Sequence, residues 1–208
     1  MTGEESPNDL PRKGHVNEAE VPLVHMAPSL SGRILVARPE LHDPNFDATL
    51  TLILEHSDEG ALGLVLNRPS RLTMADAFPD WEEMAALPNV VFAGGPVDRD
   101  ALIALGRSEQ CDGALVLGAH SVDLDAQPTL VAAEGVAEVR VFAGYAGWAA
   151  GQLEGEIANE GWWVVDATID DLFTDDPGRL WAKVLRRQRG ELRSLRWYAH
   201  FPLDPNLN

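Results

Sequence analysis

A small set of polar side chains has the chemistry needed for proton transfer. His56 follows the apolar run "TLTLILE", and Glu156 lies in the glycine-rich stretch "AGYAGWAAGQLEGEI" (143–157). A histidine or glutamate within hydrogen-bond reach of a substrate can act as a general base, as in many hydrolases. Polar residues at the ends of strands and helices also have ordinary structural roles. The residues alone therefore leave open both an enzyme that uses His56 or Glu156 and a protein in which both are structural.

A glycine turn is a second kind of candidate site. The segment "FAGGPV" (92–97) places Gly94, Gly95 and Pro96 directly after an apolar run. Backbone N–H groups in such a turn can surround an anion, although a tight turn that needs a positive φ explains the same glycines. Asn67, which precedes "RP", is a further candidate with a similar alternative, because asparagine is a common turn residue.

The stretch 143–157 predicts a strand that turns sharply into a short helix. Gly144 and Gly147 would allow the turn, and Trp148 would fold over the core. The helix would place Gln152 beside Glu156, because the two are four residues apart. We expect a shallow pocket at this corner, with the backbone donors of the "FAGGPV" glycines facing one of these two side chains. Its glutamates repel phosphate, so a cationic, amine or polar neutral ligand fits better.

Several catalytic and metal centres are missing from the sequence. The chain has no glycine-rich phosphate loop followed by lysine and no Gly-x-Ser-x-Gly nucleophile. Cys111 lies next to an aspartate, an environment that disfavours a reactive thiolate. The six histidines lack the spacing of a zinc pair. We therefore expect no metal and no cofactor.

Composition describes an acidic protein with enough apolar residues for a packed core. The 208 residues are 45% hydrophobic and carry a formal net charge of −17 at pH 7. That charge repels nucleic acid and anionic membranes unless basic residues cluster locally. No apolar run reaches the length of a membrane span, the first 22 residues lack a signal-like apolar run, and a lone cysteine fits a reducing compartment. We expect a cytoplasmic protein with a disordered acidic tail at 1–27 and one domain at 28–208.

Positive charge gathers in residues 179–196. Seven basic residues accompany one acid there, which gives the segment a formal charge of +6. One interpretation is a helix whose basic end complements its dipole and the acidic body. The other is a docking surface for an acidic protein partner, with nucleic acid disfavoured by the total charge. This candidate patch consists of Lys183, Arg186, Arg187, Arg189, Arg193 and Arg196.

Periodicity and turn residues predict the elements that position these side chains. Strands are expected at 33–37, 49–56, 61–67, 89–97, 101–106 ("ALIALG"), 113–118 ("GALVLG"), 138–148 and 162–167. The strands at 49–56 and 61–67 form a hairpin around "SDEG". Helices are expected after a Thr73–Asp76 capping box, with a break at Pro79, then over 150–160, and between Asp176 and Gly190. Strands and helices do not alternate regularly, which favours an α+β fold.

These segments, in this order, resemble the YqgE/AlgH family. The matching stretches are "GRILVARPELHDPNFDATLTLILEHSDEGALGLVLNRPS", "FAGGPV" and "FAGYAGWAAGQLEGEIANEGWW", and the resemblance spans roughly residues 30–185. It implies a cytosolic bacterial protein with a complex single-domain α+β fold that contains two β-sheets and flanking helices. The family is largely uncharacterised, some members are labelled transcriptional regulators, and the resemblance carries over no catalytic residues.

We therefore expect a non-enzymatic protein that binds a ligand or another protein and has a regulatory role. A hydrolase that uses His56 or Glu156 as general base is one alternative, and a transcriptional regulator is another. An enzyme should bring His56, Gln152 or Glu156 together in a concave pocket. A binding scaffold should hold these side chains apart, each bonded to the backbone.

Overall fold

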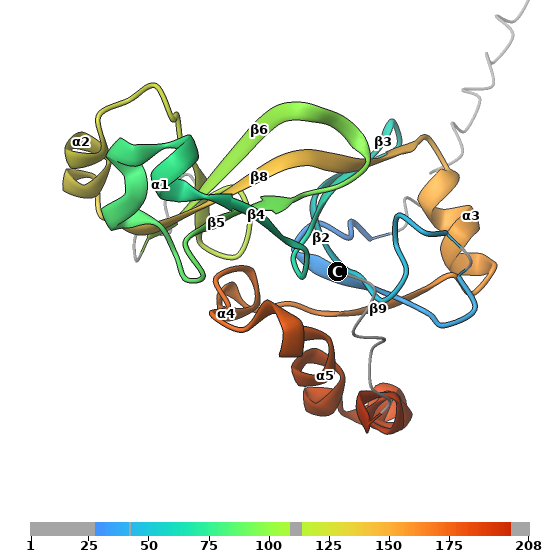
Figure 1. Cartoon of the computed structure of the whole chain (residues 1–208). Helices are drawn as coiled ribbons and strands as arrows, with labels where there is room; N and C mark the ends of the chain where they lie inside the picture. Colours follow the sequence, from blue (N-terminus) through green and yellow to red (C-terminus); the bar gives the residue numbers. More distant parts are fainter. Residues whose placement is uncertain (1–27, 42, 109–113, 201–208) are drawn as a thin grey trace, which may run out of the picture.

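The computed structural model describes residues 28–41, 43–108 and 114–200 (Figure 1). The predicted tail at 1–27 and Cys111 lie outside these residues. Within the described chain the strands are β1 (Arg33–Ala37), β2 (Leu50–Ser57), β3 (Gly60–Val65), β4 (Pro69–Thr73), β5 (Val90–Ala93), β6 (Val97–Ser108), β7 (Ala119–Ser121), β8 (Val136–Ala149) and β9 (Trp162–Asp166). The helices are α1 (Met74–Ala77), α2 (Pro128–Ala133), α3 (Gln152–Ala158), α4 (Ile169–Leu172) and α5 (Pro177–Arg187), with 3-10 helices η1 (Pro79–Met84) and η2 (Gly190–His200).

Strand β8 joins two halves of one continuous hydrogen-bonded sheet. The strand order is β4-β5-β8-β3-β2-β1-β9, and β6 pairs with β8 and β7 beside this path. The first part of β8 pairs with β6 and, in parallel, with β5, whereas residues 146–149 pair antiparallel with β3. The α+β class is thus confirmed. The two sheets implied by the resemblance are halves that share β8.

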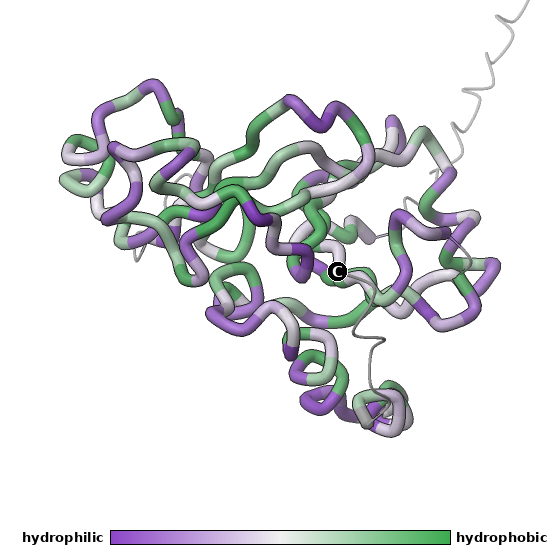
Figure 2. The backbone as a smooth tube through the Cα atoms, viewed as in Figure 1, coloured by the Kyte–Doolittle hydropathy of each residue, from purple (hydrophilic) through white to green (hydrophobic). Residues whose placement is uncertain are grey.

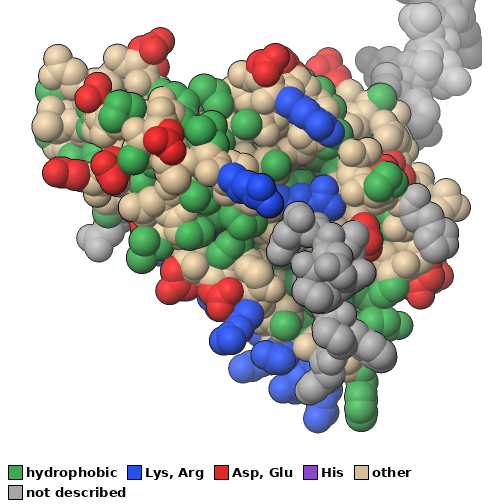
Figure 3. Space-filling view, viewed as in Figure 1, with side chains coloured by type: hydrophobic (Ala, Val, Ile, Leu, Met, Phe, Trp, Pro, Cys, Tyr) green, Lys and Arg blue, Asp and Glu red, His purple; other side chains and the backbone are tan. Residues whose placement is uncertain are grey.

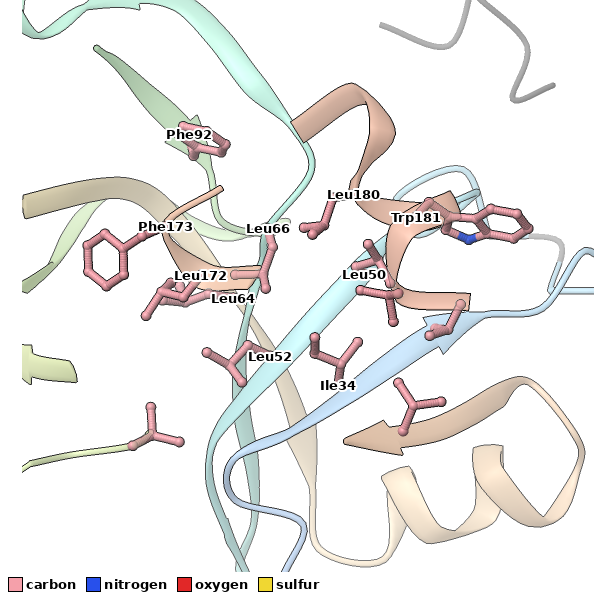
Figure 4. Packing of buried hydrophobic residues seen from close by; sticks show 14 of the residues in the cluster. Ile34, Leu50, Leu52, Leu64, Leu66, Phe92, Leu172, Phe173, Leu180 and Trp181 are labelled. Carbon is pink, nitrogen blue, oxygen red and sulfur yellow. The ribbon is translucent and has the colours of Figure 1, made fainter. Parts of the chain in front are cut away.

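The half formed by β1, β2, β3 and β9 is buried on both faces. In β1, Ile34 and Val36 belong to the core under α4 and α5, while Leu35 and Ala37 belong to the core under α3. This alternation follows the two-residue period of a strand. Figure 4 shows side chains of α4 and α5, Leu180 among them, directed at residues of β1, β2 and β3. Figure 2 shows hydrophobic residues along much of the strands and hydrophilic residues in many of the loops.

The predicted hairpin is confirmed, with a tighter turn than expected. Ser57 pairs with Gly60, so two residues of "SDEG" form the turn itself. Gly60 has a φ of +136°, and a Cβ there would lie 2.2 Å from the carbonyl oxygen of Trp148. Ala61 pairs with His56 on one side and with Trp148 on the other. The hairpin therefore places His56 two strands from the end of β8.

Helix α5 begins and ends close to its predicted signals. The Asp176 side chain accepts a hydrogen bond from the Arg179 N–H, and Pro177 occupies the first turn. The helix ends at Arg187, three residues before Gly190. The predicted apolar face is buried, namely Leu180, Trp181, Val184 and Leu185. This face fixes the outer, basic face of α5 toward solvent.

The other half of the sheet packs against α1, η1 and α2. Thr73 caps α1 by accepting a hydrogen bond from the Asp76 N–H, and the helix breaks before Pro79, as predicted. Trp81 of η1 is buried and donates its indole N–H to the Leu124 carbonyl oxygen at 3.1 Å. These elements close one face of β5, β6 and β8.

The predicted strand "GALVLG" is wrong for its described residues, 114–118. They contain one isolated bridge, between Val116 and Ala119. Leu117 and Gly118 have φ values of +55° and +85°, two successive left-handed residues that turn the chain instead of extending it. Val116 is nevertheless buried, with only 7% of its surface exposed. The apolar run therefore indicated burial correctly but not the backbone conformation, a common ambiguity of short apolar segments.

Candidate functional site

The stretch 143–157 forms the end of β8 and helix α3, with a turn later than predicted. Strand β8 continues through Gly144 and Gly147 to Ala149, so the predicted turn at these two glycines is wrong. The chain turns just before α3 at Gly151, which has a φ of +74°. Gly144, with a φ of +71°, lies where β8 passes from one half of the sheet to the other.

Glu156 is the centre of a hydrogen-bonded cluster in this corner. Its Oε2 accepts bonds from the indole N–H groups of Trp148 and Trp162, at 2.9 and 2.8 Å. Its Oε1 accepts a 3.0 Å bond from the Gln152 amide, as their spacing predicts. The Gln152 Oε1 accepts a bond from the Ala149 N–H. The carboxylate therefore holds two aromatic rings and the start of α3 in place.

Trp148 folds over the core, as predicted, and is only 6% exposed. Its ring stacks on Phe46 at a centroid distance of 6.0 Å and lies edge-on to Trp162 at 6.2 Å. Leu153 and Ile157 of α3 belong to the same cluster. On its outer side Trp148 helps line a hollow of about 250 Å³ with residues of the β2–β3 turn. The corner is thus a packed aromatic cluster beside a shallow hollow.

His56 is hydrogen-bonded within the fold on both ring nitrogens. Its Nδ1 accepts the Leu30 N–H at 3.2 Å, so the proton is on Nε2, which donates to Glu154 Oε1 at 2.7 Å. A hydrogen bond from the backbone at the start of α3, together with the bond from His56, lowers the pKa of Glu154. The partner of His56 is therefore Glu154 and not Glu156, and neither ring nitrogen faces a substrate.

Asn67 lies at the other end of the hairpin. Its Oδ1 accepts the Leu50 N–H at 3.0 Å, and its Nδ2 donates to the Ala48 carbonyl oxygen at 2.9 Å. Ala48 has a φ of +54°, so these bonds stabilise an unfavourable bend before β2. The contacts of Asn67 are those of a turn residue.

Gly94 and Gly95 pack against β8 and do not face the Trp148 corner. The Gly94 N–H donates to the Ala143 carbonyl oxygen at 2.8 Å, so the predicted orientation of this donor is wrong. Added Cβ atoms at Gly94 and Gly95 would lie 2.2 and 2.1 Å from backbone atoms of Gly144 and Tyr145. Glycine is required at this turn because backbone meets backbone.

A hollow of about 330 Å³ lies beside the same glycine turn. Gly95 and Pro96 line it together with Arg68 and Arg99. It brings together two stretches that carry the family resemblance, "NRPS" and "FAGGPV". Figure 3 shows Lys and Arg side chains in the middle of this face and again at its lower edge, with acidic side chains between and around them. The sequence prediction missed both arginines, since only the fold brings them beside Gly95.

The basic segment divides into a buried ion pair and an exposed surface. Arg187 binds Asp171, which is fully buried, through two N–O distances of 2.5 Å. Arg187 thus has a structural partner, and its side chain is 29% exposed. Trp197, in the same segment, is 77% exposed. The exposed basic residues, which we call the α5–η2 patch, are Lys183, Arg186, Arg189, Arg193 and Arg196.

Arg140 is a buried residue that the sequence prediction missed. It is 2% exposed and donates to the carbonyl oxygens of Leu172 and Thr174, at 3.0 and 2.9 Å, and of Leu87. Its guanidinium lies 4.4 Å from the centroid of the Phe92 ring. Burial lowers the pKa of Arg140 to about 10. The available signal was an arginine inside the apolar run "VRVFA".

The described residues hold no group of three or more His, Cys, Asp or Glu side chains arranged for a metal ion. Among the helices of residues 28–41, 43–108 and 114–200, none has both the length and the apolar character needed to cross a bilayer.

Comparison with known proteins identifies the relatives of this chain. Residues 34–193 match the AlgH-like family. A UPF0301 protein from Thermobifida fusca is 46% identical over 196 residues, covering 86% of this chain and 96% of that protein. The crystal structure of protein DIP2367 from Corynebacterium diphtheriae is 30% identical, with a TM-score of 0.74 over 84% of this chain and 93% of that chain. The solution structure of the AlgH protein from Pseudomonas aeruginosa is 34% identical, with a TM-score of 0.59 over 79% and 97%. The chain therefore belongs to the AlgH-like family.

Proposed function

We propose that this chain is a non-enzymatic ligand-binding protein with a regulatory role in the cytoplasm. The observation that supports it is that both candidate bases, His56 and Glu156, are already hydrogen-bonded to other residues of the fold. His56 pairs with Leu30 and Glu154, and Glu156 accepts two indole N–H groups. Neither lines the hollows beside Trp148, beside the glycine turn, or between η1 and α2. A binding site in one of these hollows needs no free base.

A panel of small metabolites and chromogenic ester, phosphoester and amide substrates tests this proposal. We expect at least one compound to raise the Tm and to be recovered chemically unchanged by mass spectrometry. A ligand at about 100 times its Kd adds about 2.7 kcal/mol to the unfolding free energy, a shift that a thermal scan resolves. Turnover that is lost in His56→Gln or Glu156→Gln, with folding intact, would instead establish the hydrolase alternative.

We also propose that the α5–η2 patch binds an acidic protein partner. The patch is basic within a chain of net charge −17, and Trp197 beside it is 77% exposed. Arginine and tryptophan are the residue types that contribute most to protein interfaces. DNA is the competing partner, since some relatives are labelled transcriptional regulators.

Fluorescence anisotropy with a labelled polyglutamate peptide and a labelled DNA duplex separates the two partners. We expect polyglutamate to bind at low salt and each of Arg189→Ala and Arg193→Ala to weaken binding about threefold, as exposed ion pairs do. Arg71→Ala, an exposed arginine on β4, is the control and should change nothing. DNA binding that persists at physiological salt and vanishes in the patch variants would support the regulator alternative.

A further inference from the structure

The hollow beside the glycine turn contains cationic side chains that form no ion pair with a carboxylate of the described residues. Arg68 and Arg99 both line it. Among the described residues, no carboxylate oxygen forms an ion pair with either guanidinium within 4.0 Å. The chain has 33 acidic residues against 16 lysines and arginines, so acidic partners are abundant. Two unpaired arginines in one hollow therefore indicate a site for an external anion.

The Arg68 guanidinium is held in position by backbone groups. Its Nη2 donates to the carbonyl oxygens of Asp47 and Pro44, at 3.2 and 3.4 Å. Burial lowers the pKa of Arg68, and the Asp47 and Asp43 carboxylates oppose this only from beyond ion-pair distance. A guanidinium has five N–H donors, so these two bonds leave donors for a ligand. Partial removal from water also strengthens its attraction to an anion.

Arg140 adds a third positive charge behind the wall of the hollow. Phe92 lines the hollow, and the Arg140 guanidinium lies 4.4 Å from the centroid of its ring. The bonds that Arg140 makes go to carbonyl oxygens, which do not neutralise its charge. Three guanidinium groups around a partly enclosed space contribute positive charge to the surroundings of a bound anion.

The remaining wall is mostly apolar, which defines the other half of the ligand. Leu72, Val91 and Pro96 line the hollow, and Leu72 is 49% exposed without a ligand. A volume of about 330 Å³ is at the small end of ligand pockets, which span roughly 300–1,000 Å³. The space fits a small molecule with an apolar body and one charged group.

We infer that this hollow binds a small organic anion whose carboxylate or phosphate group pairs with Arg68 and Arg99 while its apolar body contacts Leu72 and Val91. This inference rests on the proposed binding function and names its ligand class. It takes up the anion-binding alternative for "FAGGPV", with guanidinium groups in place of backbone N–H groups as the principal donors.

NMR titration of the full chain with benzoate, phenyl phosphate, benzyl alcohol and benzylamine tests this inference. We expect both anions to shift the backbone amide signals of Gly95 and Arg99. Benzyl alcohol has the same apolar body without the charge, and we expect it to bind about tenfold more weakly, because it lacks the charge-assisted hydrogen bonds. Benzylamine should not bind. The ratio between benzoate and phenyl phosphate shows which anionic group the site prefers.

Single substitutions then test the two arginines. Arg99→Gln should weaken benzoate binding about tenfold without affecting folding, since Arg99 is exposed and makes no ion pair within the described chain. Arg68→Gln should weaken it similarly, with the spectrum reporting whether the Pro44–Asp47 loop keeps its structure. Arg71→Gln on β4 is the matched control, because Arg71 is exposed and does not line the hollow.

Each outcome separates this inference from the proposed function. Unchanged benzoate affinity in Arg99→Gln and Arg68→Gln, or equal affinity for benzyl alcohol, would overturn the anion site. No shift with either anion at millimolar concentration would do the same. A neutral or cationic compound that binds elsewhere and is recovered unchanged would support the binding function alone. A turned-over substrate would contradict the binding function regardless of these titrations.

Discussion

An Arg140→Ala variant is expected to lose about 4 kcal/mol or more of unfolding free energy. The side chain is 2% exposed and is the donor for three carbonyl oxygens, those of Leu87, Leu172 and Thr174. Each buried acceptor left without a donor costs about 1–3 kcal/mol, and the vacated volume adds a cavity term. Release of a desolvated charge offsets part of this loss. Urea unfolding monitored by tryptophan fluorescence measures the difference.

Two further variants make the Arg140 result interpretable. Arg33→Ala removes another arginine from a strand, but one that makes an exposed ion pair at 3.2 Å and a single 3.3 Å bond to a carbonyl oxygen, and it should cost about 1 kcal/mol. Arg140→Met keeps much of the volume and removes the donors. If Arg140→Met were as stable as the native chain, the three carbonyl oxygens would not depend on Arg140, and its role would be volume alone.

Local signals predicted the elements that form from neighbouring residues. The β2–β3 hairpin followed from two apolar runs around "SDEG", and the start of α5 followed from Asp176 and Pro177. The contact between Gln152 and Glu156 followed from helical spacing alone. In each case the residues that determine the structure are close in sequence, so the pattern contains the information.

Contacts between distant residues were beyond prediction from the sequence alone. Arg140 bonds to residues 32 and 34 positions later, and Arg187 bonds to a buried aspartate from a different helix. The sequence shows that residues 179–196 are basic, but it does not show which of their arginines pairs with an aspartate elsewhere in the chain. The sharing of β8 between two halves also depends on which strands meet, and strand periodicity does not determine strand partners.

In the candidate site, too, the local features were predictable from the sequence and the contacts between distant residues were not. The sequence offered an anion cradle beside "FAGGPV" as one of two explanations, and it gave no sign that Arg68 and Arg99 line the same hollow. Gly94 and Gly95 are explained by close backbone contact with Gly144 and Tyr145. The glycines therefore shape the hollow, and two arginines from separate parts of the chain, Arg68 just before β4 and Arg99 on β6, contribute its positive charge. Sequence spacing could identify the turn but not the side chains that the turn brings together.

A Trp148→Ala variant is expected to lose about 3 kcal/mol or more of unfolding free energy. The ring is 6% exposed and packs against Phe46 and Trp162, so its removal leaves a cavity in the aromatic cluster. Glu156 also loses one of its two indole donors. Thermal and urea unfolding of the full chain measure the loss, with circular dichroism showing whether the fold persists.

Trp148→Phe and Gln152→Ala separate packing from hydrogen bonding in this corner. Trp148→Phe keeps most of the aromatic contact and removes the indole N–H, so an intermediate loss of about 1–2 kcal/mol is expected. Gln152 is exposed, and Gln152→Ala should leave the fold intact with a change under about 1 kcal/mol. Unchanged stability in Trp148→Ala would mean that the glycine-rich stretch is not structural, and a ligand platform would then explain its tryptophan. A large loss in Gln152→Ala would instead show that the polar network, more than the aromatic packing, holds α3 against β8.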